Sequence, residues 1–318
     1  MSGHHRSRFT GLFRLVALLT AVCLMAACGP IEAPKPVPTV PPTTDATQPA
    51  TEPTVQEPPE TAPPETAPPE PDPYIPPPPI LTVDPTIRTE SGLPGIFLWA
   101  LGQMRDYAIN NGLDPDLYTK DMAFTYLLNE DAREFCLEYP RYRNKESTAD
   151  MTAYENMEGV PLFLQWDPQW GYFDYGGNLM GLAGCGPTTL AMAAYYFTGD
   201  PDMNPLSLAQ FAMDNGYRYP GNGTAWSFMS DGAQQLGLRS QALPLHKETM
   251  IQALEDGALI ICIMGPGNFT TSGHFILLTG YENGAFTVND CNSITRSNRT
   301  WTYEELCGEI WNLWAIRP

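Results

Sequence analysis

The chain has 318 residues, of which 43% are hydrophobic and 11% aromatic, enough apolar material for one or two cores of ordinary size. Its formal net charge is −19, from 36 acidic and 17 basic side chains. Nucleic acid binding needs clustered Lys and Arg, so this charge excludes nucleic acid as a partner. An acidic membrane surface would repel the chain unless a covalent anchor held it there.

Residues 1–27 have the pattern of an export signal. A short basic segment precedes a 13-residue apolar run that is too short to span a bilayer as a helix. The run ends in Ala-Ala-Cys28-Gly, which resembles the lipobox of bacterial lipoproteins, where the Cys is lipidated and becomes the new N-terminus. We therefore predict a signal peptide over 1–27, a lipid on Cys28, and a lipid-anchored location on the extracytoplasmic face of the cell membrane. The alternative is ordinary secretion with cleavage nearby.

Residues 28–86 differ from the rest in composition. Of the 33 prolines, 21 lie between Pro30 and Pro85, and the motif Glu-Thr-Ala-Pro-Pro occurs twice in succession, from Glu60 and from Glu65. Such a segment cannot bury enough apolar surface to fold, and its prolines make it stiff and polyproline-like. We predict a disordered linker that holds the folded part away from the membrane.

Helical periodicity begins after the linker. Apolar residues, among them Met104 and Ala108, recur at helical spacing. Asn129 is placed to cap a further helix, which Pro140 is expected to end. Because no motif with chemistry occurs here, we predict that residues 87–150 are a helical segment that packs against the main domain.

The clearest catalytic signal lies in residues 151–318, the predicted main domain. There Gly184-Cys185-Gly186 precedes an apolar helical run, so Cys185 is expected at the N-terminus of a buried helix. The helix dipole at that end stabilises a thiolate and lowers the thiol pKa. A buried structural cysteine would be expected within the apolar face, not between two glycines. We predict that Cys185 is a nucleophile.

A thiolate nucleophile works with an imidazole partner, and only two histidines remain once the signal peptide is removed. His274 precedes an apolar run of strong β character, which suits an imidazole fixed at the start of a buried strand. His246 begins a predicted exposed helix that ends near Gly257, so we expect it on the surface. The alternative for His274 is a hydrogen-bonded core histidine. With two histidines and no CxxC pair, we expect no metal and no cofactor.

A hairpin follows the His274 strand, and its register can be predicted in two ways. The residues Glu-Asn-Gly at 282–284 predict a turn, after which the chain returns over 285–290. A two-residue loop pairs Glu282 with Ala285. A three-residue loop pairs Tyr281 with Ala285, and this is the loop that we predict.

The register decides whether His274 has an acidic partner. The two-residue loop puts His274 and Asp290 on opposite faces of the hairpin. The three-residue loop makes them diagonal neighbours on one face, within reach of a hydrogen bond. We therefore predict that Asp290 orients the imidazole and stabilises its cation. Asn289 and Asn292 are alternatives, and Asp290 could instead be a turn former at the strand end.

An oxyanion donor should lie near the thiol. One candidate is the backbone N–H of Cys185, and the other is Gln165, which follows a short apolar strand and precedes an Asp-Pro turn.

Four blocks, taken in order, resemble the bacteriocin-processing-peptidase-like (double-glycine leader peptidase-like) cysteine peptidases of the papain-like clan. They are Gln165-Trp-Asp-Pro-x-Trp, Gly-Cys185-Gly-Pro-Thr, Gly-His274-Phe and Asn-Asp290, and the similarity covers about residues 157–316. The resemblance implies that Gln165 is the oxyanion residue, Cys185 the nucleophile, His274 the base and Asp290 the orienting acid. It also implies an α+β, papain-like fold, in which helices of the Cys185 half pack on an antiparallel sheet.

The sequence thus predicts a surface-anchored, monomeric cysteine peptidase or amidase that acts on a peptide, a protein or a cell-wall peptide. Because export is expected, leader processing in the cytosol is not the expected task. Two alternatives remain: acyl transfer by the same triad, and a non-catalytic binding module. A disulfide between Cys291 and Cys307 is also left open.

Overall fold

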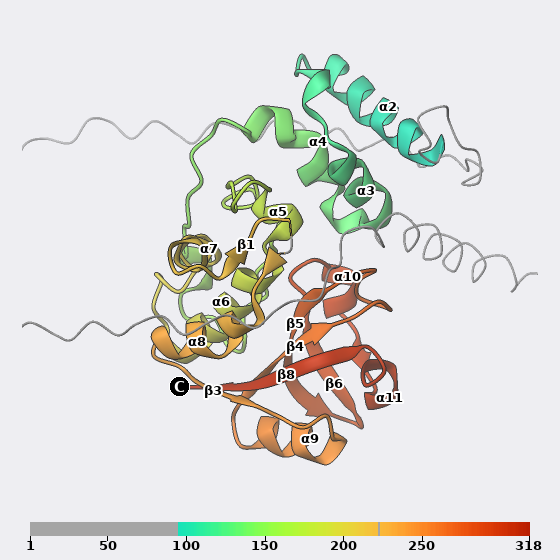
Figure 1. Cartoon of the computed structure of the whole chain (residues 1–318). Coiled ribbons are helices and arrows are strands. Elements are labelled where there is room, and N and C mark those ends of the chain that lie inside the picture. The colour runs from blue at the N-terminus through green and yellow to red at the C-terminus, as the bar shows by residue number, and fades with distance from the viewer. Residues whose placement is uncertain (1–94, 222) are drawn as a thin grey trace, which may run out of the picture.

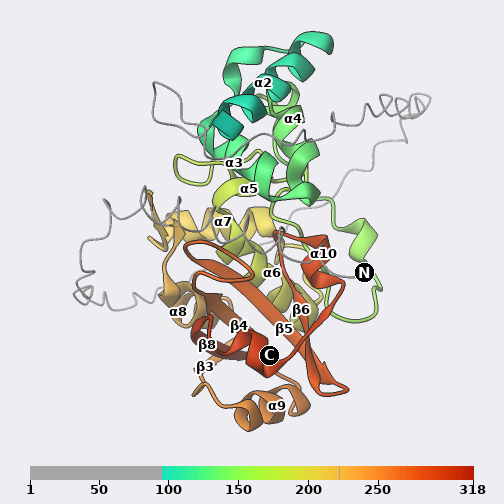
Figure 2. The ribbon, with the colours of Figure 1, turned by 90° about the vertical axis from the view of Figure 1, so that its right-hand side faces the viewer.

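The computed structural model describes residues 95–221 and 223–318. The predicted signal peptide, Cys28 and the Pro-rich linker therefore lie outside the described residues. Within the described part, no helix is both long and apolar enough to cross a membrane. A helical segment at the N-terminal side of this part stands on a larger unit of helices and an antiparallel sheet (Figures 1 and 2).

The helical segment has three α-helices and two short 3-10 turns. In chain order these are α2 (Gly95–Asn110), η1 (Pro115–Leu117), α3 (Lys120–Leu128), η2 (Glu130–Ala132) and α4 (Arg133–Tyr142). Met104 and Ala108 are fully buried in its core, as the periodicity predicts.

Two boundaries in the helical segment differ from the prediction. Asn129 caps η2, accepting a hydrogen bond from the backbone N–H of Asp131, and α4 begins only after that turn. Helix α4 also continues past Pro140 to Tyr142. Proline removes one helical hydrogen bond, but Pro140 lies in the last turn, so the helix loses little before it ends.

The helical half of the main unit surrounds α6 (Cys185–Thr198), in which every residue from Gly186 to Tyr195 is buried. Helix α6 ends at Thr198 and is capped by Gly199, whose left-handed φ of 64° suits a glycine. Around α6 lie η3 (Thr152–Tyr154), α5 (Met180–Ala183), α7 (Pro205–Asp214), the ribbon β1 (Arg218–Tyr219) and β2 (Gly223–Thr224), η4 (Trp226–Met229) and α8 (Asp231–Gln235).

The other half is a six-stranded sheet in the order β3-β8-β4-β5-β6-β7, in which every pairing is antiparallel. The strands are β3 (Arg239–Ala242), β4 (Leu259–Met264), β5 (His274–Glu282), β6 (Ala285–Asn289), β7 (Thr300–Trp301) and β8 (Ile310–Arg317). Three helices complete this half: α9 (Lys247–Glu255), α10 (Ile294–Ser297) and α11 (Tyr303–Leu306). His246 precedes α9 and is exposed, as predicted.

Two cores form because side chains alternate along the central strands. In β4, Ile261 and Ile263 belong to the core shared with α6 and α7, whereas Ile260 and Cys262 belong to the core beside α9. The sheet is therefore covered on both faces, with α6 on one and α9 on the other (Figure 1). This confirms the predicted α+β class, with the Cys185 helix packed on an antiparallel sheet.

The hairpin has a different loop from the one predicted, but His274 and Asp290 still lie on the same side of it. Glu282 pairs with Ala285, so the loop has two residues, Asn283 and Gly284, both with positive φ. The predicted three-residue loop is therefore wrong. A β-bulge at Thr279 then shifts the register, so that Leu278 pairs with Val288 and Leu277 with Asn289.

The bulge compensates for the short loop. Continued by one position, the pairing of Leu277 with Asn289 brings Ile276 level with Asp290. His274 and Asp290 then lie diagonally on one side of the hairpin, as the three-residue loop would have placed them.

Candidate active site

Cys185 is the first residue of α6, as predicted from the sequence. Its two glycine neighbours are required by close packing. A Cβ atom at Gly184 would lie 2.3 Å from Met180 Sδ, and one at Gly186 would lie 2.6 Å from Thr224 Oγ1. Both glycines therefore let neighbouring elements close tightly around the start of the helix, while Cys185 itself stays partly exposed.

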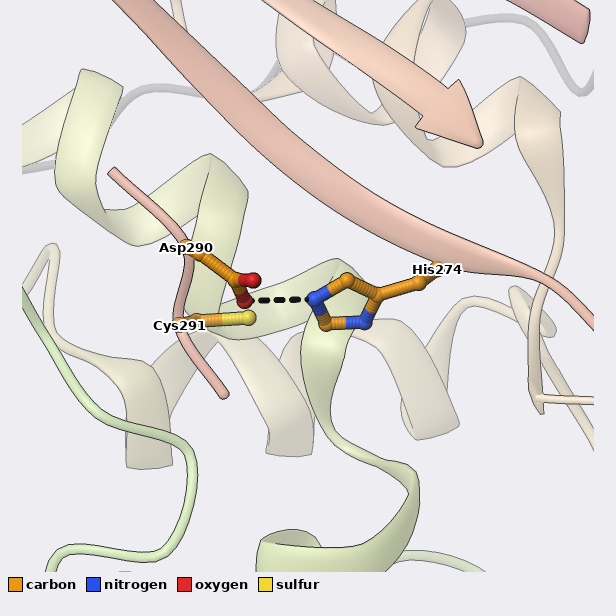
Figure 3. A group of neighbouring side chains, drawn as sticks. All are labelled: His274, Asp290 and Cys291. Carbon is orange, nitrogen blue, oxygen red and sulfur yellow. Dashed lines mark hydrogen bonds and ion pairs between the residues drawn. The ribbon is translucent and has the colours of Figure 1, made fainter. Parts of the chain in front are cut away.

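His274 opens β5 and is 5% exposed. Its Nε2 lies 2.7 Å from Asp290 Oδ1, and the second ring nitrogen points away from that carboxylate (Figure 3). The imidazole and the Cys185 thiol also lie close enough to shift each other's pKa. Because Nε2 is taken by Asp290, Nδ1 is the ring atom left for the sulfur.

The thiol of Cys185 and the imidazole of His274 each favour the charged form of the other. Burial raises the pKa of the Cys185 thiol, but the hydrogen bond and positive charge of His274, with backbone hydrogen bonds at Phe275 and Gly186, outweigh burial and lower it. Burial lowers the pKa of His274, but the charge and hydrogen bond of Asp290, with a smaller contribution from Cys185, raise it to about 9. Between these two pKa values, thiolate and imidazolium coexist.

Asp290 is completely buried and accepts three hydrogen bonds. Oδ1 accepts from His274 and from the backbone N–H of Asn292 at 2.8 Å, and Oδ2 accepts from Arg296 Nε at 2.5 Å. Burial raises the pKa of this carboxyl, but the charges and hydrogen bonds of His274 and then Arg296 lower it. The acid is therefore ionised and can hold the imidazolium.

Sequence reasoning missed Arg296. It lies six residues after Asp290 on α10, and its only sequence signal is a basic side chain close to the predicted acid in a strongly acidic chain. The two alternatives to Asp290 have other partners. Asn289 Nδ2 donates to the carbonyl of Pro161 at 2.9 Å, and the side chain of Asn292 accepts from Asn129.

Gln165 is 4% exposed, and its amide is held from two directions. Nε2 donates to the carbonyl of Gly181 at 2.8 Å, and Oε1 accepts from the Cys291 thiol at 3.5 Å. The amide nitrogen carries two hydrogens, and among the described residues only Gly181 accepts one of them. The same Cys291 sulfur lies 3.7 Å from the Cys185 carbonyl, so Gln165 and Cys185 share this neighbour.

Cys291 is buried and Cys307 is half-buried. Both are free cysteines, so the structure contains no disulfide between them. Burial and the negative charge of Cys185 raise the pKa of the Cys291 thiol. The Cys291 sulfur, a ring nitrogen of His274 and a carboxylate oxygen of Asp290 all lie within 4.8 Å of one another (Figure 3). Three such atoms at this spacing could in principle bind a metal ion. The carboxylate is already bound to His274 and to the positive Arg296, however, which disfavours a second cation there.

The comparisons with known proteins agree with the resemblance drawn from the sequence. A model of the Peptidase_C39 like family matches residues 157–317, half of the chain, so the chain belongs to the Peptidase_C39 like family. No curated protein sequence matches the chain.

Two solved structures are also similar. One is the peptidase domain of Streptococcus ComA, a bifunctional ABC transporter involved in quorum sensing, with 19% identity, a TM-score of 0.34, and coverage of 43% of this chain and 92% of that one. The other, from Bacillus anthracis, is described as a C39-like peptidase and has 15% identity, a TM-score of 0.33, and coverage of 50% and 94%.

The ion pair predicts how Cys185 reacts with iodoacetamide. At pH 6 the thiolate should persist in the folded protein, so Cys185 should be alkylated at least about tenfold faster than in urea, where its pKa returns to about 8.5. Replacing His274 by Ala should remove this advantage. The rate is measured by mass spectrometry of the Cys185 peptide, which separates it from the half-buried Cys307. Equal rates in the folded and unfolded protein would contradict the ion pair.

Proposed function

We propose that this chain is a lipid-anchored, extracytoplasmic cysteine peptidase or amidase with the triad Cys185, His274 and Asp290. The observation that carries the proposal is the 2.7 Å hydrogen bond between His274 and the buried Asp290 carboxylate, beside a Cys185 thiol whose pKa that imidazole lowers. The charges of these groups favour a thiolate beside an imidazolium, the form needed for attack on an amide.

In the proposed reaction, the Cys185 thiolate attacks the amide carbonyl carbon, and the carbonyl oxygen becomes an oxyanion. His274 gives its Nδ1 proton to the leaving amine, the C–N bond breaks, and a thioester remains on Cys185. His274, now neutral, takes a proton from water, which attacks the thioester. The acid product leaves and the thiolate is restored. Asp290 keeps Nδ1 directed at the sulfur throughout and stabilises the imidazolium whenever His274 is protonated.

Two donors are available for the oxyanion. The second hydrogen of Gln165 Nε2 is one, because Gly181 and Cys291 fix the amide plane. The backbone N–H of Cys185 is the other, since the first residues of a helix have N–H groups without an intrahelical acceptor. Both would act where charge develops in the transition state.

The proposed substrates are peptides, proteins or cell-wall peptides, cleaved by the protein as a monomer. A covalent lipid on Cys28 would hold this acidic chain at a membrane that its charge of −19 would otherwise avoid. The Pro-rich residues 28–86 would then set how far the enzyme reaches from the membrane.

Acylation can be tested before the natural substrate is known. With p-nitrophenyl acetate, the protein should release a burst of about one nitrophenol per active site, and Cys185→Ala should abolish it. The rate should rise as pH passes the lowered pKa of Cys185. Peptide cleavage should fall again as pH passes about 9, where His274 loses the proton that the leaving amine needs.

The products of that test separate the alternatives. Added amines that capture the acyl group in place of water would indicate an acyl transferase. A folded protein with no burst at any pH would favour a non-catalytic binding module.

Gln165→Ala should lower kcat/KM for a peptide or ester substrate about a hundredfold, the usual effect of losing one oxyanion donor. Alkylation of Cys185 by iodoacetamide forms no oxyanion, so its rate at pH 6 should not change. A parallel loss of alkylation would mean that the substitution had disturbed Cys185 itself, contrary to the proposed role.

Cys28→Ser should remove radiolabelled fatty acid from the protein and release it from the membrane fraction, because lipidation requires the thiol. Cys23→Ser is the matched control, since it alters a cysteine inside the apolar run, five residues before Cys28, and should leave anchoring intact. Loss of the label in Cys23→Ser with retention in Cys28→Ser would refute the assignment of Cys28.

A further inference from the structure

The helical segment Gly95–Tyr142 contacts the loop that carries the acidic side of the site. This loop, residues 290–296, begins at Asp290 and ends at Arg296, which bind each other. Asn129 reaches it from the end of α3: its Nδ2 donates to the backbone carbonyl of Asn292 at 2.6 Å and to Asn292 Oδ1 at 3.0 Å. Since the N–H of Asn292 binds the Asp290 carboxylate, Asn129 holds a residue that itself holds the acid.

Asp131, two residues after Asn129, binds the same loop at Ser293 and Thr295. Its Oδ2 accepts from Ser293 Oγ at 2.8 Å and from the backbone N–H of Thr295 at 3.1 Å, and its Oδ1 accepts from Thr295 Oγ1 at 3.3 Å. Ser293 caps α10 by accepting from the N–H of Arg296. Asp131 therefore fixes the cap of the short helix from which Arg296 reaches Asp290, and α10 lies beside the helical segment in Figure 1.

The helical segment also contacts the oxyanion side of the site. The ring of Phe135, on α4, lies so close to Gly181 that a Cβ atom there would be 2.3 Å from Cζ. Tyr172 stacks on this ring with centroids 4.8 Å apart and donates its hydroxyl to the Phe135 carbonyl at 3.1 Å. Gly181 is the residue whose carbonyl holds the Gln165 amide.

We infer that the helical segment Gly95–Tyr142 is a positioning element of the catalytic site, in which Asn129 and Asp131 set the Asp290–Arg296 loop and Phe135 sets the turn that orients Gln165. This inference rests on the proposed function and adds an anchor to it that lies outside residues 157–317, the range of the family match.

The reason such an anchor matters is electrostatic. Asp290 carries a buried charge that both His274 and Arg296 contact, and its effect on the imidazole depends on where the loop holds it. When the loop moves and the carboxylate withdraws, the pKa of His274 falls and that of Cys185 rises. The thiolate fraction at low pH then falls, although neither Asn129 nor Asp131 touches the reacting atoms.

The test compares four variants of the full-length protein. Asp131→Ala removes all three acceptor contacts, Asp131→Asn keeps one oxygen and the side-chain shape, and Asp106→Ala changes an exposed aspartate of the same segment, on α2. Alkylation of Cys185 by iodoacetamide is followed from pH 5 to pH 9, with thermal unfolding recorded in parallel. Asn129→Ala tests the second anchor.

The alkylation rate at pH 6 should fall about fivefold in Asp131→Ala, as expected for a lost hydrogen-bonded contact worth about one net hydrogen bond, and by a similar factor in Asn129→Ala. The profile should shift towards higher pH. Asp131→Asn should recover most of the rate, and Asp106→Ala should match the wild type.

A purely structural role gives a different result. The melting temperature of Asp131→Ala would fall, but the pH profile of the molecules still folded would stay where it is, and this would overturn the inference while leaving the triad intact. If the wild type itself shows no low-pH advantage, the proposed function fails instead. Should Asp131→Ala not fold, Phe135→Leu supplies the second arm: kcat/KM should fall several-fold at an unchanged alkylation rate, and an unchanged kcat/KM would overturn the inference.

Discussion

A single buried negative charge organises the candidate active site of this molecule. Asp290 has no exposed surface, yet it is ionised, because an imidazole, a guanidinium and a backbone N–H all donate to it. A buried carboxylate without such partners would be protonated and could not stabilise a cation. The raised pKa of His274, and through it the lowered pKa of Cys185, follow from keeping that charge in place.

Arg296 is a second positive partner of the Asp290 carboxylate. It neutralises part of the charge that His274 uses, so the carboxylate serves two cations at once. Arg296 keeps the Asp290 carboxyl ionised even when the imidazole of His274 is neutral. In the proposed reaction, it is this neutral imidazole that accepts a proton from water. Because Arg296 belongs to a short helix capped by Ser293, the position of the charge depends on local loop structure as well as on the sheet.

Local chemistry explains which parts of the site the sequence could predict. A cysteine between two glycines before an apolar run, and a histidine before a β-rich run, are patterns in which backbone geometry follows directly from residue type. They placed Cys185 and His274 correctly at the starts of α6 and β5. Arg296 could not be placed in this way, because its role depends on a loop that folds back on a partner six residues earlier.

The hairpin marks the limit of register prediction. Residue preferences at the tip were compatible with two loops, and the bulge at Thr279 has no evident signature in the sequence. The contacts of Asn129 and Asp131 could not be predicted from the sequence either, because they join residues more than 160 positions apart and involve polar side chains with no periodic pattern. The general packing of the helical segment on the main unit was predictable from its apolar periodicity, whereas its specific anchoring points were not.

Because of the extra residue in β5, Thr279, two different hairpins would give the same alignment of His274 with Asp290. One is the observed two-residue loop with a bulge at Thr279, and the other is a three-residue loop without a bulge. Each leaves one residue of the first strand unpaired, so Ile276 lies level with Asp290 in both. If the pairing at the tip moved by one residue, so that Tyr281 paired with Ala285, and the bulge were kept, His274 and Asp290 would lie on opposite faces of the hairpin. A one-residue shift of the pairing at this solvent-exposed tip must therefore be offset at Thr279 if His274 and Asp290 are to stay on one face.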